Sequence, residues 1–527
     1  MEQSKGIKTA FPAAAETTPW DKINEAARRY SLRPTALPQR DNIPFWNRNA
    51  RQFIHPPAFE AAPSDAAREY LFELKDDEGR LIADFRADSP REPLTPVWDR
   101  VPVGNVELSI SPLDADGNRL TPVFFRKFYR CACFHGPYPA VSHDYQAAAQ
   151  RCFANVYNLP HVQAWLNGGT VDEKVYRKYC YPSKTLSAMI KALLYYRQIT
   201  QSAEEAEKAL RIAVKMADWL IDNSCAKGTP LEYLPPTYWR YAEYQLAKPH
   251  IGQIMMIYPM TVGCAYLRVY RATGERRYLD AALRLAETMK RLQLPCGSWI
   301  LKLYEKDGES VVQNIVVLNE TMMKFMTELA EISGDKSFIA MRDKAYSYVL
   351  ENNLRLWNWD GQFEDVIPKA IYENLTKDGA LFVASELFRQ GDIARALEIV
   401  DWSEDQFVVW SSPNPQIPGY QTFVLPVALE QYHCYSPVDA SLGRFIFAFS
   451  EAYKYTHDRL YLEKAKALAD CVLRNQRPDG SIPTWFCQVD LPDWVNCMIY
   501  AAESLQYLAR VIETDTGESS GDLKTRQ

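Results

Sequence analysis

Residues 272–289 read ATGERRYLDAALRLAETM, and this stretch determines the fold class that we predict for most of the chain. Its apolar residues fall at offsets 0, 1, 4, 7, 8 and 11 from Tyr278, which is the stripe of an amphipathic helix. Gly274 precedes the stripe, and glycine readily takes the left-handed conformation that ends a helix. The stretch therefore predicts the end of one helix, a tight turn and a second helix with one buried face.

The same unit recurs along the chain. Stripes of this spacing also begin at Ala209, Phe338, Ile393 and Tyr461, the Phe338 copy with Arg342 at one apolar position and the Ile393 copy shorter. Turns like that at Gly274 occur at 333–335, 390–392 and 456–458. Before the turns lie segments that are apolar nearly all round, and helices without a polar face must be buried.

These buried segments number six, and together they predict the architecture. They are 181–199, 255–270, 322–332, 381–388, 442–453 and 494–511. Residues 145–156 supply an outer partner for the last of them. Each repeat consists of an inner buried helix, a tight turn and an outer amphipathic helix. Six such repeats predict a mainly α protein with an (α/α)6 toroid.

The N-terminal part of the chain has a different pattern. Residues 1–67 are Pro-rich and irregular, whereas from 68 to 134 apolar residues alternate with polar ones and turn signals intervene. This pattern predicts a small antiparallel β-sandwich of the immunoglobulin or fibronectin kind. We therefore expect an irregular segment over 1–67, the sandwich over 68–134, the toroid over 135–512 and a disordered polar tail over 513–527.

Composition narrows the classes of partner. The net charge of −6 provides no basic surface for nucleic acid, and no apolar run reaches the ~20 residues of a membrane span. The sequence shows no signal peptide, and its 11 cysteines fit reduced thiols, so we expect a cytoplasmic protein. Seven histidines without paired spacing predict no zinc site, and no phosphate-binding loop or cofactor motif is present. The oligomeric state stays open.

The connections between the predicted helices are unequal. Inner-to-outer turns are short, whereas the outer-to-inner connections, 224–252, 294–318, 354–377, 402–436 and 476–492, are long. All long connections should therefore lie on one rim, where function concentrates on a rigid scaffold. They contain more than half of the 13 tryptophans, namely Trp239, Trp299, Trp357, Trp359, Trp402, Trp410 and Trp485. These indoles either anchor the loops or form a groove on which sugar rings stack.

Carboxylates collect on the same predicted rim. Glycoside hydrolysis needs two of them, one as general acid and one to activate water or attack the anomeric carbon. The candidates are Glu320, Asp439, Asp378 and Asp365, with Glu364, Glu373, Glu430, Asp490 and Asp493 also on the rim. Glu320 is the best single candidate, because an apolar helix mouth raises the pKa of a carboxyl by desolvation. Asp378 and Asp439 are better explained as helix caps than as catalytic residues.

Other rim residues are candidates for binding a sugar. We predict Trp239, Tyr258, His250, Asn319, Trp299, Trp359, His433, Tyr435, Trp485, Asp493 and Trp494 as substrate-binding residues. His433 and Tyr435 belong to a dense polar and aromatic cluster, which is either a site wall or a self-packed loop. Tyr258 and His250 form a second group, and a Tyr–His pair is able to abstract the C5 proton of a uronic acid.

The repeated units, such as 272–279, together with Pro478-Asp479-Gly480-Ser481-Ile482-Pro483, resemble the six-hairpin glycosidases and related polysaccharide lyases over residues 68–511. Within that group the chain is most similar to the β-glucuronidases of glycoside hydrolase family 154. The resemblance implies exo-acting release of a terminal uronic acid. It also implies basic residues near the substrate carboxylate, for which Lys302, Arg240 and Lys369 are the candidates.

Several functions stay open at this stage. The leading hypothesis is a hydrolase that acts on an oligosaccharide or glycoside with a terminal uronic acid. A polysaccharide lyase using the Tyr–His pair is the first alternative, and a non-catalytic carbohydrate-binding protein is the second. A sugar epimerase of similar toroid form would normally lack the β module.

Overall fold

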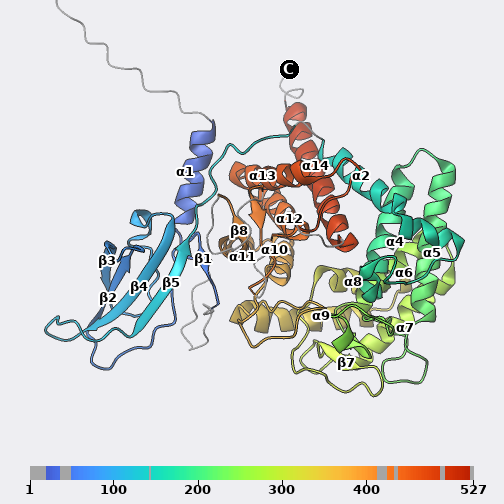
Figure 1. Ribbon diagram of the computed structural model, residues 1–527, viewed down its shortest axis with the longest axis horizontal. Coiled ribbons are helices and arrows are strands. Elements are labelled where there is room, and N and C mark those ends of the chain that lie inside the picture. Colours follow the sequence, from blue (N-terminus) through green and yellow to red (C-terminus); the bar gives the residue numbers. More distant parts are fainter. Residues whose placement is uncertain are drawn as a thin grey trace, which may run out of the picture.

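The computed structural model describes residues 19–35, 49–141, 144–411, 424–432, 437–486 and 493–522. Figure 1 shows a β-sheet on one side, a short helix above it and a large body of helices on the other side. None of the described helices is both long and apolar enough to cross a membrane.

The β-sheet has five strands in the order β1-β5-β4-β2-β3. The strands are β1 Gln52–Phe53, β2 Glu69–Lys75, β3 Leu81–Ala87, β4 Gly104–Leu113 and β5 Phe124–Arg130. Pairing is antiparallel except between β1 and β5, which run parallel. The alternation of buried and exposed residues along β2 matches the period-two pattern of its sequence.

Within the described residues this part forms one sheet rather than the expected two-layered sandwich. Its buried face packs against irregular segments, not against a second sheet. Phe59 contacts the rings of Phe53, Phe124 and Phe128. Trp98, in the 3-10 turn Trp98–Arg100, donates its indole N–H to the carbonyl of Ile54 at 2.9 Å. Large aromatic side chains thus bury the sheet where a second layer of strands was predicted.

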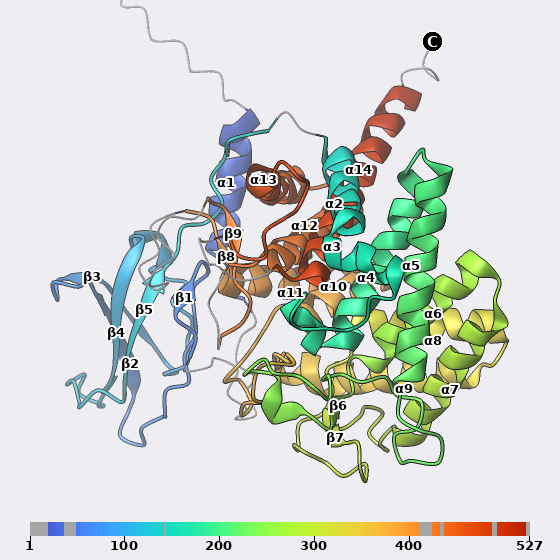
Figure 2. The ribbon, with the colours of Figure 1, turned by 45° about the vertical axis from the view of Figure 1, so that its right-hand side comes forward.

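Twelve helices form six hairpins, as the repeats predict. The inner helices are α4 Pro182–Ile199, α6 Pro259–Thr273, α8 Glu320–Ser333, α10 Asp378–Gln390, α12 Asp439–Thr456 and α14 Val495–Asp522. Their outer partners are α5 Ala203–Asp222, α7 Arg276–Leu292, α9 Ser337–Tyr348, α11 Ile393–Phe407, α13 Arg459–Asn475 and α2 Tyr145–Asn158. The helix α14 packs against both α2 and α4, so the last hairpin meets the first and the ring closes (Figure 2).

The tight turns have the predicted geometry. Gly274, Gly334 and Gly391 end α6, α8 and α10 in the left-handed conformation, with φ of 74°, 75° and 85°. His457 takes the same conformation after α12, with φ of 55°. Each of these residues lets its backbone N–H close the last turn of the preceding helix.

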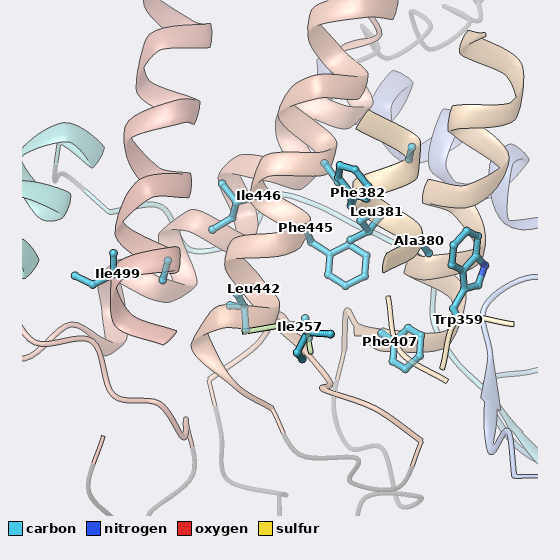
Figure 3. Close-up of a cluster of buried hydrophobic side chains, with 14 of the residues drawn as sticks. Ile257, Trp359, Ala380, Leu381, Phe382, Phe407, Leu442, Phe445, Ile446 and Ile499 are labelled. Carbon is cyan, nitrogen blue, oxygen red and sulfur yellow. The ribbon is translucent and has the colours of Figure 1, made fainter. Parts of the chain in front are cut away.

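Apolar side chains of the inner helices form the core of the ring. Figure 3 shows one buried cluster, to which α10 contributes Leu381 and Phe382 and α12 contributes Leu442 and Phe445. Trp359 belongs to this cluster and has no exposed surface. The helices α10 and α12 are therefore buried on most of their circumference, as their sequences predict, whereas α8 has exposed residues such as Lys324 and Glu331.

The long connections lie together and are joined by short β pairs. The strands β6 Gln253–Met255 and β7 Lys302–Tyr304 join two successive connections, and β8 Val408–Val409 pairs with β9 Val427–Ala428. Single bridges link Thr376 with Gln431 and Val438 with Trp485. Neighbouring connections thus hold one another in place around one rim.

Several boundaries differ from the predictions. Trp402 lies inside α11, which runs on to Phe407, and not in a connection. Residues 19–31 of the segment predicted as irregular form the helix α1, Pro19–Ser31. The helix α14 continues to Asp522, beyond the end predicted at 512. Short turns complete the described chain: α3 Pro160–Gln163, 3-10 turns 164–167, 177–180 and 248–250, and a π turn 349–354.

Candidate active site

Four potential functional side chains are positioned by the N-terminal ends of inner helices. Lys184 lies in the first turn of α4, Tyr258 directly precedes α6, Lys377 precedes α10 and Trp494 precedes α14. Since the inner helices form a ring, their N-terminal ends surround one region at the mouth of the ring. The rim predicted from connection lengths is therefore also the place where these side chains meet.

The long connections add carboxylates and lysines to the same region. Glu364 and Asp365 come from the connection before α10, Glu430 follows β9, Lys302 opens β7, and Lys178 lies in the 3-10 turn before α4. We call the residues Lys178, Lys184, Tyr258, Lys302, Glu364, Asp365, Glu430 and Trp494 the rim cluster.

Glu364 is the anchored carboxylate of the rim cluster. It is 1% exposed, forms an ion pair with Lys184 and accepts a short hydrogen bond from the hydroxyl of Tyr258. Tyr238 donates its hydroxyl to the backbone carbonyl of Glu364 at 2.9 Å. Burial alone would raise the pKa of Glu364, but the Lys184 ammonium outweighs burial and holds this pKa below its usual value. Glu364 is therefore a fixed anion whose charge Lys184 neutralises.

Asp365 is the more accessible member of the carboxylate pair. Its side chain is partly exposed, in contrast to that of Glu364. Burial and the adjacent Glu364 charge raise the pKa of Asp365, while Lys184 and Lys178 oppose this increase. The Asp365 charge acts in turn on Lys302 and Glu430, so Asp365 lies near both of these groups.

Glu430 is held through its backbone and leaves its carboxyl group available. Its carbonyl oxygen accepts hydrogen bonds from Thr376 Oγ1 at 2.9 Å and from Lys377 Nζ at 2.8 Å. Burial raises the pKa of the Glu430 carboxyl to about 7, against the attraction of Lys377. A carboxyl with this pKa is about half protonated at pH 7 and is able to act as a general acid.

Two lysines lie over the indole of Trp494. The ammonium of Lys178 is 3.7 Å from the ring centroid and that of Lys184 is 4.0 Å away. Tyr181 stacks on the same indole at 5.5 Å. Burial, together with the neighbouring Lys184 charge, lowers the pKa of Lys178 to about 8. Trp494 thus holds two cations beside the carboxylates, rather than offering a free ring to a sugar.

Lys302 carries a buried charge that is not hydrogen bonded within the described part of the chain. It is 1% exposed, and its ammonium has no hydrogen-bond partner among the described residues. Its nearest ring is that of Tyr238, at 5.5 Å from the ammonium. Burial lowers the pKa of Lys302 to about 8, while Glu364 and Asp365 oppose this decrease. An unpaired buried ammonium is costly, so a ligand that supplies an anionic acceptor would be favoured there.

Glu320 differs from its prediction. Its side chain is 46% exposed, so the desolvation expected at an apolar helix mouth does not occur. It lies 3.9 Å from Arg444, which also approaches Asp378 at 3.5 Å. Burial would raise the pKa of Asp378, but Lys377 and Arg444 outweigh burial and lower it. Glu320 and Asp378 therefore balance Arg444 instead of providing a proton.

Asp439 is fully buried and does not share a cavity with Glu320. The small cavity that Glu320 lines has room for about one water molecule, and Asp439 is not among its described lining residues. The hydrogen bond that Asp439 accepts within the described chain comes from the N–H of Ala440, at 2.6 Å. Burial raises the pKa of Asp439 well above its usual value. Without exposed surface, Asp439 does not meet a substrate in this structure.

Most of the predicted tryptophans anchor loops. Trp299 is 1% exposed and donates to the carbonyl of Met289 at 2.7 Å, and Trp359 lies in the core cluster described above. Trp239 is partly exposed, but it packs on Trp219 at 4.9 Å and on Tyr241 at 5.3 Å. The prediction of Trp299 and Trp359 as sugar platforms is therefore wrong, because burial leaves them no free ring face.

Other predicted binding residues have structural partners. Asn319 caps α8 by accepting from Met322 N at 3.0 Å. Asp493 accepts from Thr484 N at 2.8 Å and forms a close ion pair with Arg477. Trp485 is partly exposed, and its buried indole N–H has no hydrogen-bond partner within the described chain. His433 and Tyr435 lie outside the described residues.

The contacts of Tyr258 and His250 bear on the hypothesis that these two residues act as a catalytic pair. The ring of His250 packs against Tyr238 at 5.1 Å, whereas the hydroxyl of Tyr258 points to Glu364.

Within the described residues no group of three or more His, Cys, Asp or Glu side chains is arranged to hold a metal ion.

The structure is similar to solved structures of other helical proteins. A D-mannose isomerase matches with a TM-score of 0.51 at 11% sequence identity, over 71% of this chain and 100% of that chain. The fold is an (α/α)6 toroid. A family 76 glycoside hydrolase from a bovine Bacteroides thetaiotaomicron strain has a TM-score of 0.44 at 10% identity, over 87% of this chain and 95% of that one. An unsaturated glucuronyl hydrolase specific for heparin also has a TM-score of 0.44 at 10% identity, over 70% and 97% of the two chains.

At these identities the likeness concerns the toroid alone. No protein-family model matches the sequence, and no curated protein matches it either. The resemblance to the β-glucuronidases of family 154 therefore stays a prediction. What this toroid does must be inferred from the rim cluster itself.

Proposed function

We propose that this toroid is a glycoside hydrolase that releases a terminal uronic acid from an oligosaccharide or glycoside. The observation that carries the proposal is the arrangement of the rim cluster. Two partly exposed carboxyl groups, Asp365 and Glu430, lie beside buried lysines, of which Lys302 has no hydrogen-bond partner in the described chain. The carboxyl groups suit glycoside cleavage, and the lysines suit an acidic sugar.

Glu430 is the proposed general acid. With a pKa of about 7 it is protonated in about half of the molecules at pH 7 and can transfer its proton to the glycosidic oxygen as the bond to the leaving group breaks. Its backbone is fixed by Thr376 and Lys377, so the position of the carboxyl group is restrained. Glu430 takes the role that the sequence assigned to Glu320.

Asp365 is the proposed second carboxylate. It activates the attacking water or attacks the anomeric carbon, and the choice depends on the separation of the two carboxyl groups. Its pKa is raised by burial and by Glu364, yet Lys178 and Lys184 favour its ionised form. Glu364 itself is too buried to reach a substrate, and we assign it the role of positioning Lys184 and Tyr258.

Lys302 is the proposed partner of the substrate carboxylate. Because Lys302 is only 1% exposed, the side chains that cover its ammonium must move aside for a substrate to reach it. A uronate would give its ammonium the acceptor that it lacks and would remove the cost of an unpaired buried charge. Lys178 adds a second positive charge near the carboxylate pair. A neutral sugar would leave Lys302 unsatisfied, so we expect selection for the acid.

Elimination is a less favoured reaction at this site. A lyase needs a base for the C5 proton, and burial together with the Glu364 charge raises the pKa of Tyr258 well above its usual value. Its hydroxyl already donates to Glu364, and His250 packs on Tyr238 instead of contacting it. The pair that motivated the lyase hypothesis therefore lacks a poised base.

Product analysis tests the proposal. The purified chain is incubated with an aryl glucuronide and with oligosaccharides ending in glucuronic acid, and the products are resolved by mass spectrometry. Hydrolysis predicts a released uronic acid that has gained one water. An unsaturated product without the added water would establish elimination, and binding without turnover would establish a carbohydrate-binding protein.

A further inference from the structure

A second pocket lies beside the rim cluster, on the outer side of the β6–β7 pair. It is lined by Cys225, Ala226, Thr229, Ile251, Gly252, Tyr304, Glu305 and Lys306. Its volume of about 560 Å³ falls within the range of about 300–1,000 Å³ typical of small-molecule sites. None of its described lining residues belongs to the rim cluster.

The chain leads directly from the rim cluster to this pocket. Lys302 and Tyr304 are two residues apart on β7, so their side chains leave the same face of the strand about 7 Å apart. Lys302 is 1% exposed, whereas Tyr304 is 37% exposed. His250, whose pKa is lowered by burial and by the charge of Lys302, directly precedes Ile251 of the pocket. A ligand that contacts both the rim cluster and this pocket would lie along β7.

The pocket combines a partly exposed aromatic ring with a carboxylate that has no hydrogen-bond partner among the described residues. The Lys306 ammonium lies over the Tyr304 ring, 5.5 Å from its centroid, so a sugar that stacks on that face must displace it. Tyr304 and Ile251 are among the large apolar residues that stay exposed, at 37% and 38%. The carboxyl group of Glu305 is partly buried and accepts no hydrogen bond from any described residue. Lys306 is 77% exposed and forms an ion pair with Asp307 at 3.3 Å. Burial raises the pKa of Glu305, and the nearby Arg240 charge opposes this increase, so Arg240 balances the Glu305 charge only in part.

We propose that this pocket binds an uncharged sugar unit, through stacking on Tyr304 and hydrogen bonds from sugar hydroxyls to Glu305. A pyranose ring has one apolar face for the phenol ring and neighbouring hydroxyls for a carboxylate. An acidic sugar is disfavoured, because Glu305 would repel its carboxylate. The pocket thus differs from the rim cluster, where lysines dominate, and it suits the neutral part of a longer glycan.

Binding of uncharged probes tests this pocket without requiring any turnover. Gluco-, manno- and xylo-tetraose are titrated into the full chain and followed by ligand-observed NMR. We expect at least one to bind in the wild type, and Tyr304→Ala to weaken that binding roughly fivefold. Glu305→Gln should weaken it to a similar extent. Tyr241→Ala is the matched control, because Tyr241 is 72% exposed on a neighbouring loop and does not line the pocket.

The outcomes separate this proposal from the proposed function. No binding by any of the three probes, or equal binding by wild type and Tyr304→Ala, would overturn the pocket assignment. Absence of uronide hydrolysis would leave the binding result standing, since the probes carry no uronic acid. Where hydrolysis is observed, Tyr304→Ala should raise KM for a uronate-terminated tetrasaccharide and leave KM for an aryl glucuronide unchanged. Circular dichroism confirms that each variant is folded.

Discussion

The rim cluster and the junction between the sheet and the ring both contain several buried charges. The two regions differ in whether these charges have hydrogen-bond partners within the protein. At the junction, Asp405 accepts from the N–H groups of Ile54 and His55 at 2.6 and 2.7 Å, and Glu404 pairs with Lys464 at 2.5 Å. In the rim cluster, the Lys302 ammonium has no hydrogen bond from the described residues. The junction charges join two parts of the molecule, whereas in the rim cluster the charge of Lys302 has no hydrogen-bond partner among the described residues.

This comparison teaches that burial of charge does not by itself identify a site. Burial raises the pKa of Asp405 and of Glu430 alike to about 7. Asp405, however, has no exposed surface and all its partners are within the protein, while Glu430 is partly exposed. The four predictions below ask whether changes in the two regions have correspondingly different effects.

The largest effect is expected for Glu430→Gln. Loss of the general acid should lower kcat on uronides about 10²–10⁴-fold, because the glutamine amide cannot donate a proton to the leaving oxygen. Steady-state kinetics on an aryl glucuronide provide the measurement. Glu331→Gln, an exposed change on α8, is the control and should retain wild-type activity. Full activity of Glu430→Gln would remove Glu430 from the mechanism.

Lys302→Met should impair binding more than chemistry. We expect KM for an aryl glucuronide to rise about 30-fold, with thermal stability equal to or above that of the wild type. Stability should not fall, because the change removes a buried ammonium without a hydrogen-bond partner in the described chain. Lys324→Met on α8 is the control for loss of an exposed lysine. A large drop in thermal midpoint with unchanged KM would show that Lys302 is structural.

The pH dependence of kcat/KM should reflect the protonated form of Glu430. Since the acid must carry its proton, activity should fall about tenfold per pH unit once the pH exceeds the Glu430 pKa of about 7. Deprotonation of Lys302, with a pKa of about 8, should raise KM further at alkaline pH. A rate that increases steadily from pH 6 to 9 would contradict these assignments.

The smallest effect on activity is expected for Asp405→Asn. Because burial raises the pKa of Asp405 to about 7, its stabilising contribution is complete below the unfolded pKa of about 4 and is lost as the pH rises through 7. The asparagine should reduce the fall in thermal midpoint between pH 5 and 8 and change kcat/KM by less than about twofold. A marked loss of activity would show that the junction and the rim cluster are coupled.

The fold was predictable because its repeats are local signals. Gly274 and the stripe from Tyr278 define one hairpin, and the closing pair of α2 and α14 followed from counting the remaining apolar segments. The sandwich was not predictable in the same way. Alternating residues indicate strands, but they do not say whether a second sheet or aromatic loop residues such as Phe59 cover them.

The site was predicted only in part, since exposure decides it and exposure depends on the tertiary structure. Asp365, predicted as catalytic, and Tyr258 and Trp494, predicted as substrate-binding, lie in the rim cluster, and their roles stay predictions. Trp299 and Trp359 have the same sequence signature as a binding ring, yet the fold buries them. Glu320 differs from its prediction for the opposite reason. It was expected to be desolvated at the N-terminal end of α8, but its side chain is 46% exposed.

The buried lysines of the rim cluster are the main feature of the candidate site that the sequence pattern did not predict. A chain with 60 lysines and arginines gives no spacing signal for the few that are buried. Lys302 was a candidate for binding the substrate carboxylate only because of the resemblance to glucuronidases, and Lys178 was not a candidate. One usable signal was present at Lys184, which is the only charged residue in the first turn of an inner helix, among Pro182, Ser183 and Thr185.

The selectivity of the wild-type chain between two matched substrates tests the central claim most directly. The two substrates are an aryl glucuronide and the corresponding aryl glucoside, which differ only in the carboxylate that Lys302 is proposed to bind. We predict a kcat/KM for the glucuronide at least about 100-fold higher, since the site is built to pair an acid. Equal values, or a preference for the glucoside, would contradict the account.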